Sequence, residues 1–185
     1  FSLNGVVSYV LSQVDRYAAS WHFDGGAYAA LSLMSNVANL VSLPKIVTSN
    51  QWIRSISDEK AFLGKVRKTS FIYSLCFGIT ILGLFFLVKD IVLADYIFND
   101  FVWVLLLGAC FFEIVVGPIG MVLQYNHSVK YVVLSDTLTV AILASVFLIT
   151  KDMSATAVTF GMFYFLSRSV MVLTRFFTWK YIKNV

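Results

Sequence analysis

Six long apolar stretches, separated by polar connections, dominate the pattern of hydrophobic positions along the chain. They cover residues 1–20, 27–47, 70–88, 101–125, 131–150 and 155–179. A helix needs about 20 mostly apolar residues to cross a bilayer, and each stretch has roughly that length. The pattern therefore predicts an all-α, polytopic bundle of six transmembrane helices that forms one domain over residues 1–185.

Glycine and proline mark the expected breaks in this pattern. Gly25 and Gly26 separate the first two stretches, and Pro44 lies near the end of the second. Gly117 and Pro118 lie inside the fourth stretch, where proline removes an internal hydrogen bond. We expect a kink at that point.

Composition excludes most other classes of protein. The chain is 59% hydrophobic and only 13% charged, whereas soluble domains are about 25% charged. An ordinary soluble enzyme, a disordered tail and a fibrous repeat are excluded. The net charge of +4 is read as basic cytoplasmic loops, and no nucleic-acid partner is expected. Phe1 is not Met and already resembles a helix interior, so we expect a fragment of a longer protein.

Charges in the connections alternate in register with a six-helix count. The basic side carries Lys45, Arg54, Lys60, Lys65, Arg67 and Lys68 against Asp58 and Glu59, then His127 and Lys130, then Lys180 and Lys183. The opposite side carries Asp24, then Lys89, Asp90, Asp95 and Asp100, then Lys151 and Asp152. Because basic loops stay inside, both termini are predicted to be cytoplasmic. Residues 51–68 are either an interfacial helix or a solvated basic loop.

Polar side chains recur at helical spacing within the first two stretches. The first stretch carries Tyr9, Gln13, Arg16 and Ser20 on one face, with Asp15 beside them. The second carries Ser32, Ser35, Asn36, Asn39 and Ser42. Hydrogen-bonded helix packing is one explanation for such stripes. With Asp15 and Arg16 adjacent, we favour a hydrated cavity.

Ionisable residues also lie deep in the later stretches. Glu113 and Arg168 fall near the midplane, where an unpaired charge is costly, so they are expected to pair or to share a cavity. Arg168 forms either a structural ion pair or a contact with an anionic group, since guanidinium binds phosphate bidentately. Asp136 lies in the fifth stretch. Arg175 shares a face with Arg168 and is expected to snorkel to the interface as a topology anchor.

The inventory of catalytic groups is thin. His22 and His127 lie in connections on opposite sides of the membrane, and no histidine pair has metal-ligand spacing. Cys76 and Cys110 are expected to be small buried hydrophobes. We therefore expect no metal and no cofactor.

Several short motifs occur in register with the helices. Ser12-Gln13-Val14-Asp15-Arg16-Tyr17 lies in the first, Ala27-Tyr28-Ala29-Ala30 opens the second, and Leu43-Pro44 closes it. The basic connection 48–69 and the turn Tyr125-Asn126-His127-Ser128-Val129-Lys130-Tyr131 follow. Over nearly the whole chain, this arrangement resembles the polysaccharide (O-antigen type) flippases of the multidrug/oligosaccharidyl-lipid/polysaccharide exporter superfamily.

The resemblance implies that this chain is half of a two-lobe transporter. Of the two lobes, it favours the C-terminal one. It implies movement of an undecaprenyl-diphosphate-linked oligosaccharide across the cell inner (cytoplasmic) membrane, with membrane lipids as the surroundings and a proton or sodium ion as coupling ion. Substrate-binding candidates are Gln13, Arg16, Asn36, Asn39 and Arg168, and ion-coupling candidates are Asp15, Glu113 and Asp136.

Two alternatives of other classes remain open, namely an integral-membrane enzyme of lipid or glycan synthesis and a membrane scaffold subunit that does not transport. A multidrug exporter of the same superfamily is a close variant of the flippase function that the resemblance implies. The enzyme would use Glu113 or Asp136 as its base, and the lack of a nucleophile or metal motif counts against it.

Overall fold

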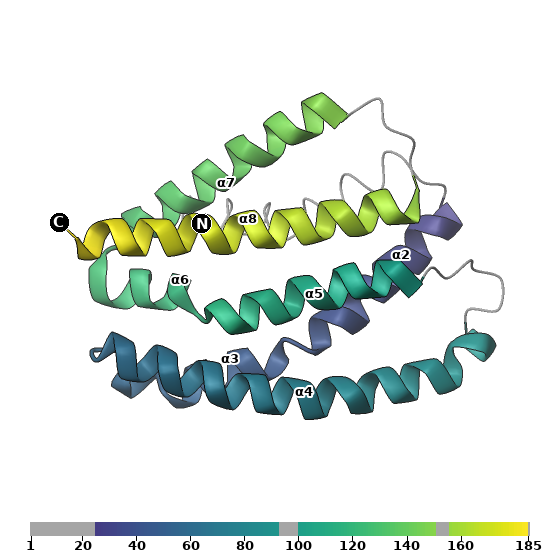
Figure 1. Ribbon diagram of the computed structural model, residues 1–185, viewed down its shortest axis with the longest axis horizontal. Helices are drawn as coiled ribbons and strands as arrows, with labels where there is room; N and C mark the ends of the chain where they lie inside the picture. The colour runs from purple at the N-terminus through teal and green to yellow at the C-terminus, as the bar shows by residue number, and fades with distance from the viewer. Residues whose placement is uncertain (1–24, 93–99, 151–155, 185) are drawn as a thin grey trace.

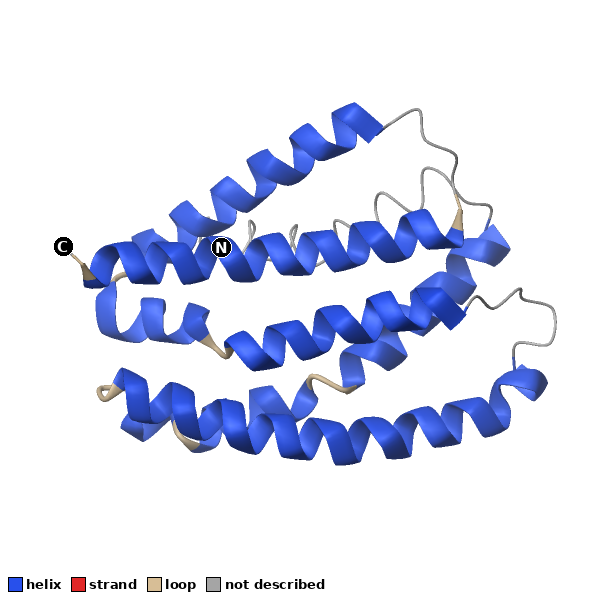
Figure 2. Ribbon diagram, viewed as in Figure 1, coloured by secondary structure: helices blue, strands red, loops and turns tan. Residues whose placement is uncertain are grey.

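A computed structural model describes residues 25–92, 100–150 and 156–184, and within them every regular element is a helix (Figures 1 and 2). The predicted all-α class is therefore confirmed. In chain order the elements are α2 (Gly25–Leu40), α3 (Leu43–Gln51), η1 (Ile53–Ser55), α4 (Glu59–Val92), α5 (Asp100–Val116), α6 (Ile119–Val122), the π-helical η2 (Leu123–His127), α7 (Val129–Thr150) and α8 (Ala157–Lys183).

Within the described residues, four stretches are long and apolar enough to cross a membrane. They are Tyr28–Gln51, Glu59–Leu87, Phe101–His127 and Val129–Leu148, so the chain has the character of a multi-pass membrane protein. Helix α8 has 27 residues but is not among the four, and it carries Arg168 and Arg175. The predicted first helix, residues 1–20, lies outside the described residues, so the count of six spans stays a prediction.

The predicted break at Gly117 is confirmed. Helix α5 ends at Val116 and α6 begins at Ile119, with Gly117 at a φ of +87°. Glycine adopts this left-handed conformation without the steric cost that a Cβ would add. Pro118 has no N–H with which to continue the ladder of α5, so the chain breaks here.

The expectation that Pro44 closes the second helix is wrong. The chain turns earlier, at Val41 and Ser42, and Pro44 lies in the first turn of α3. Proline suits a helix start because its missing N–H has no partner there and its φ is already helical. The second apolar stretch thus comprises two helices, and the turn between them changes the direction of the chain (Figure 1).

Both alternatives for residues 51–68 also need correction. Between α3 and α4 the chain forms only the 3-10 helix η1 and a short turn, and from Glu59 it belongs to α4, which has 34 residues. The Asp58 carboxylate accepts a hydrogen bond from the Ala61 amide at 3.1 Å, which caps the helix start. A helix of this length measures about 50 Å and extends beyond a hydrocarbon core of about 30 Å.

Two apolar clusters form among the described residues, one towards each end of the bundle. The first gathers side chains of α2, α4, α5 and α8, including Leu31, Phe85, Trp103, Leu106 and Phe160. The second, which we call the α4 cluster, comprises Phe62, Leu63, Val66, Ile119, Val122, Leu123 and Val132. Helices α5 and α8 lie side by side (Figure 1). Between the two clusters they carry the ionisable residues Glu113 and Arg168.

Only one of the two cysteines is buried, although both were expected to be. Cys110 is buried in the first cluster, as predicted, whereas Cys76 is exposed on α4, and both are free thiols. Cys76 lies on the surface of α4 that borders an apolar groove against α3, so it faces away from both clusters.

Candidate functional site

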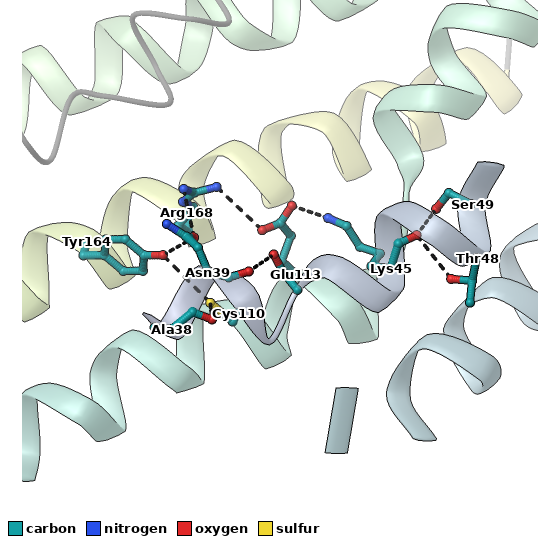
Figure 3. A network of polar contacts seen from close by, with 10 residues as sticks. Ala38, Asn39, Lys45, Thr48, Ser49, Cys110, Glu113, Tyr164 and Arg168 are labelled. Carbon is teal, nitrogen blue, oxygen red and sulfur yellow. Dashed lines mark hydrogen bonds and ion pairs between the residues drawn. The ribbon is translucent and has the colours of Figure 1, made fainter. Parts of the chain in front are cut away.

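Glu113 of α5 stands at the centre of a charged network, one turn before the helix break (Figure 3). Its Oε1 forms an ion pair with the Lys45 ammonium of α3, and its Oε2 lies 3.8 Å from Nη1 of Arg168 in α8. All three side chains are mostly buried, with 12% of Lys45, 17% of Glu113 and 21% of Arg168 exposed. The predicted pairing of Glu113 with Arg168 is confirmed, with Lys45 as an additional partner.

Asn39 and Tyr164 extend this network towards the first cluster. The buried Tyr164 hydroxyl donates to Oδ1 of Asn39 at 2.6 Å, and Nη2 of Arg168 donates to the same oxygen at 3.4 Å. The Arg168 guanidinium also lies 5.4 Å from the centre of the Tyr164 ring. Because Asn39, Glu113 and Tyr164 all hold it, the Arg168 fork has a defined orientation.

Asp136 and Arg175 form a second, bidentate ion pair between α7 and α8. Nε of Arg175 donates to Oδ1 of Asp136 at 2.9 Å, and Nη2 donates to Oδ2 at 3.0 Å. Asp136 has no exposed surface. The expectation that Arg175 snorkels as a topology anchor is therefore wrong, because a buried carboxylate on the neighbouring helix holds its guanidinium inside the bundle.

A cavity of about 270 Å³ lies beside these pairs, at the α5–α6 break. Its charged lining comes from Lys45, Glu113 and Arg175, and Ser49, Asn50 and Gln124 add uncharged polar groups. Among the described residues, the two ion-pair networks bring together the cations Lys45, Arg168 and Arg175 with only the carboxylates Glu113 and Asp136. The surroundings of the cavity thus have a local excess of positive charge.

Arg67 of α4 secures the helix break from the other side. Its Nε donates to the backbone carbonyl of Val116 at 2.8 Å, which satisfies an acceptor that the break deprives of its helical donor. A Cβ added to Gly117 would come within 3.1 Å of the same Nε. The break, and with it the wall of the cavity, therefore depends on a close approach between Arg67 and Gly117.

A further polar cluster lies where α4 begins and α8 ends. The Glu59 carboxylate accepts hydrogen bonds from Nε2 of His127 at 2.8 Å, Nε1 of Trp179 at 2.9 Å and Nζ of Lys183 at 3.0 Å. Nδ2 of Asn126 lies 3.3 Å from Glu59 and also donates to the carbonyl of Ile56 at 2.6 Å. One carboxylate thus joins α4, η2 and α8.

The structure brings together some of the predicted site residues. Asn39, Glu113 and Arg168 meet in one network, and Asp136 lies in the adjoining pair. Asn36 lies on an exposed face of α2, outside the contacts of Figure 3. Gln13, Asp15 and Arg16 lie outside the described residues.

Lys45 and Arg67 were missed at the sequence level. Both were counted with the basic connection, although Lys45 falls inside the stretch 27–47. A lysine within a predicted span was the available signal.

Comparison with protein-family models, characterised proteins and solved structures finds no match to this chain. Across the part of the chain that the structure describes, no three His, Cys, Asp or Glu side chains gather as metal ligands would.

Proposed function

We propose that the chain is one lobe of a membrane transporter that moves a lipid-linked oligosaccharide across the cytoplasmic membrane. One observation carries the proposal, namely a cavity bordered by Lys45, Glu113 and Arg175 in a bundle that has four stretches apolar enough to span a membrane. Ionised groups inside a bilayer are costly, and in membrane proteins they mark substrate or ion pathways. The helix break beside the cavity fits this function, because discontinuous helices form the binding sites of many transporters.

The cations are suited to a diphosphate. In the proposed bound state, phosphate oxygens compete with Glu113 for Lys45 and Arg168, because phosphate is an acceptor for the same donors. Asn39 and Tyr164 orient the Arg168 fork for a bidentate contact. Arg175 keeps Asp136 as its partner and contributes its charge at the cavity wall.

Glu113 is the stronger of the two described candidates for ion coupling. It lines the cavity, whereas Asp136 has no exposed surface and is held by Arg175. Protonation of Glu113 would release Lys45 and Arg168 for an anionic substrate, which links proton binding to substrate binding. A sodium ion would serve the same step only if it displaced both cations from the carboxylate.

The ion pairs favour this function over an integral-membrane enzyme. A general base must reach the proton it abstracts. Asp136 does not meet this requirement, because it has no exposed surface and is held by Arg175.

The test is transport by the full-length protein in proteoliposomes that contain a fluorescent undecaprenyl-diphosphate oligosaccharide. We expect Lys45→Gln and Arg168→Lys to slow transport at least tenfold with near-normal expression, the latter because lysine lacks the planar fork. Lys60→Gln, at an exposed position on α4, is the matched control and should transport normally. Unchanged transport in both the Lys45 variant and the Arg168 variant would refute the proposal.

A further inference from the structure

Four lysines lie over aromatic rings at the end of the bundle where α4 begins and α8 ends. Their ammonium groups lie 4.9–5.1 Å from the ring centres. The pairs are Lys65 with Trp52, Lys130 with Tyr131, Lys180 with Phe176 and Lys183 with Trp179. All four rings pack, partly buried, against the α4 cluster, so the pairs surround one apolar core, and we call them the lysine–aromatic collar.

The charge around the collar is strongly biased. The four lysines are exposed, and Arg54, Lys60 and Lys68 add three further exposed cations nearby in the chain. Among the described residues of these segments, Asp58 is the exposed acid, because Glu59 is mostly buried and bonded to Lys183. This surface is therefore complementary to anions.

Large apolar side chains are exposed between the lysines. Val129 adjoins Lys130, and Phe177 and Tyr181 flank Lys180 with 62% and 71% of their surface exposed. A surface facing water alone does not favour such side chains, whereas the boundary between hydrocarbon and headgroups accommodates both the apolar side chains and the ammonium groups. The mixture distinguishes a lipid surface from a nucleic acid or an acidic protein as the partner.

From these observations we propose that the lysine–aromatic collar binds the headgroups of anionic phospholipids in the leaflet at this end of the bundle. The rings sit at headgroup depth with their bodies against the α4 cluster, and they hold each ammonium where it contacts a lipid phosphate. Anionic lipids are selected over zwitterionic ones because the collar offers few exposed carboxylates to a choline or ethanolamine group. Basic segments next to a membrane are attracted to anionic lipid surfaces in the same way.

Lipid binding by the collar is a stronger claim than the rule that basic loops stay on the cytoplasmic side. Retention of basic loops on one side requires only that the lysines stay there. The collar additionally places each ammonium beside an aromatic ring, from the α3–η1 junction, α7 or α8. It also stands apart from the proposed transport function, since none of its residues lines the cavity at the helix break.

The test uses the full chain in detergent micelles, titrated with dioleoyl phosphatidylglycerol, dioleoyl phosphatidylcholine or inorganic phosphate while thermal unfolding is followed. We expect phosphatidylglycerol to raise the unfolding temperature at least twice as much as phosphatidylcholine, and phosphate to have little effect. The triple variant Lys65→Gln/Lys130→Gln/Lys180→Gln should lose at least half of this difference, whereas the three Lys→Arg changes should keep it. Lys183 is left intact because it also holds Glu59.

A second measurement needs no variant. With the wild-type chain, raising the salt concentration to about 1 M should reduce the preference for phosphatidylglycerol severalfold, because salt screens exposed charges. Equal effects of the two lipids, a full response in the Lys→Gln triple variant, a salt-independent preference, or an equal effect of free phosphate would each overturn the proposal.

Discussion

Lys45 forms an ion pair with Glu113 across 68 residues of chain, and this contact joins α3 to α5 inside the bundle. Glu113 also faces Arg168, so one carboxylate balances two largely buried cations. Without the carboxylate, neither cation would keep its charged partner. The contact therefore couples stability to the charge state of the cavity.

We expect Glu113→Gln to destabilise the chain by about 2–4 kcal/mol, since a buried charge that loses its partner is costly. The double variant Glu113→Gln/Lys45→Gln should recover part of this loss, because it removes one of the stranded cations. Chemical unfolding in mixed micelles, analysed as a double-mutant cycle, measures the coupling. Strictly additive effects of the two single changes would contradict the pairing.

The Asp136–Arg175 pair leads to a sharper prediction, because Asp136 has no exposed surface. Asp136→Asn should cost about 3–5 kcal/mol by leaving the Arg175 guanidinium without its counter-ion. The double replacement Asp136→Leu/Arg175→Leu should be much milder, since it removes both charges from the interior. Unfolding temperatures of the two variants and of the wild type in one detergent provide the comparison, and a double variant as unstable as Asp136→Asn would contradict the prediction.

The break at Gly117 offers a matched pair of glycine substitutions. Gly117→Ala should destabilise by about 1–3 kcal/mol, because its φ is left-handed and the new Cβ would lie 3.1 Å from Nε of Arg67. Gly64→Ala is the control: it lies within α4 with no heavy atom within 4 Å of its added Cβ, and should stabilise by about 0.5–1 kcal/mol. Equal effects at the two positions, measured by thermal unfolding, would refute the strain argument.

The sequence was sufficient where local physics decides the outcome. Hydropathy placed α7 to within two residues at its start, and Gly117-Pro118 predicted the break between α5 and α6 because both residues act on their own backbone. Local reasoning failed at Pro44, since a proline near the end of an apolar stretch fits either a helix end or a new first turn. The turn at Val41 and Ser42 decided between them.

The ion-pair partners on neighbouring helices were harder to predict from the sequence. The spacing of Arg168 and Arg175 placed both on one face of α8, but it did not show that α7 brings the buried Asp136 against Arg175. Lys45 was assigned to the basic side because it lies near the end of the second apolar stretch, and no local pattern pointed to its partner Glu113, 68 residues away. Such pairs depend on how the helices cross, which hydrophobic periodicity does not specify.

The predicted topology is testable by cysteine labelling in a variant that lacks Cys76 and Cys110. A membrane-impermeant thiol reagent applied from the cytoplasmic side should label cysteines placed at Lys60 and His127, and from the outside it should label those at Asp24 and Asp95. The reason is the alternation of basic and acidic connections. Asp24 and Asp95 lie outside the described residues, so the experiment also tests the count of spans. The reverse labelling pattern would disprove the topology.

Glu59 should have an effect on stability out of proportion to its place at the end of a helix. Its carboxylate accepts from His127, Trp179 and Lys183, so Glu59→Gln puts an amide donor among donors and leaves Lys183 without its counter-charge. We expect a loss of about 2–3 kcal/mol, within the range for a mostly buried charged group that loses its hydrogen-bond partners. Lys60→Gln, one residue on and exposed, should change stability by less than about 0.5 kcal/mol. Hydrogen exchange would locate the effect: amides at the start of α4 and at the end of α8 should lose protection together in Glu59→Gln, because one carboxylate joins both ends. Loss of protection confined to α4 would show that Glu59 only supports its own helix.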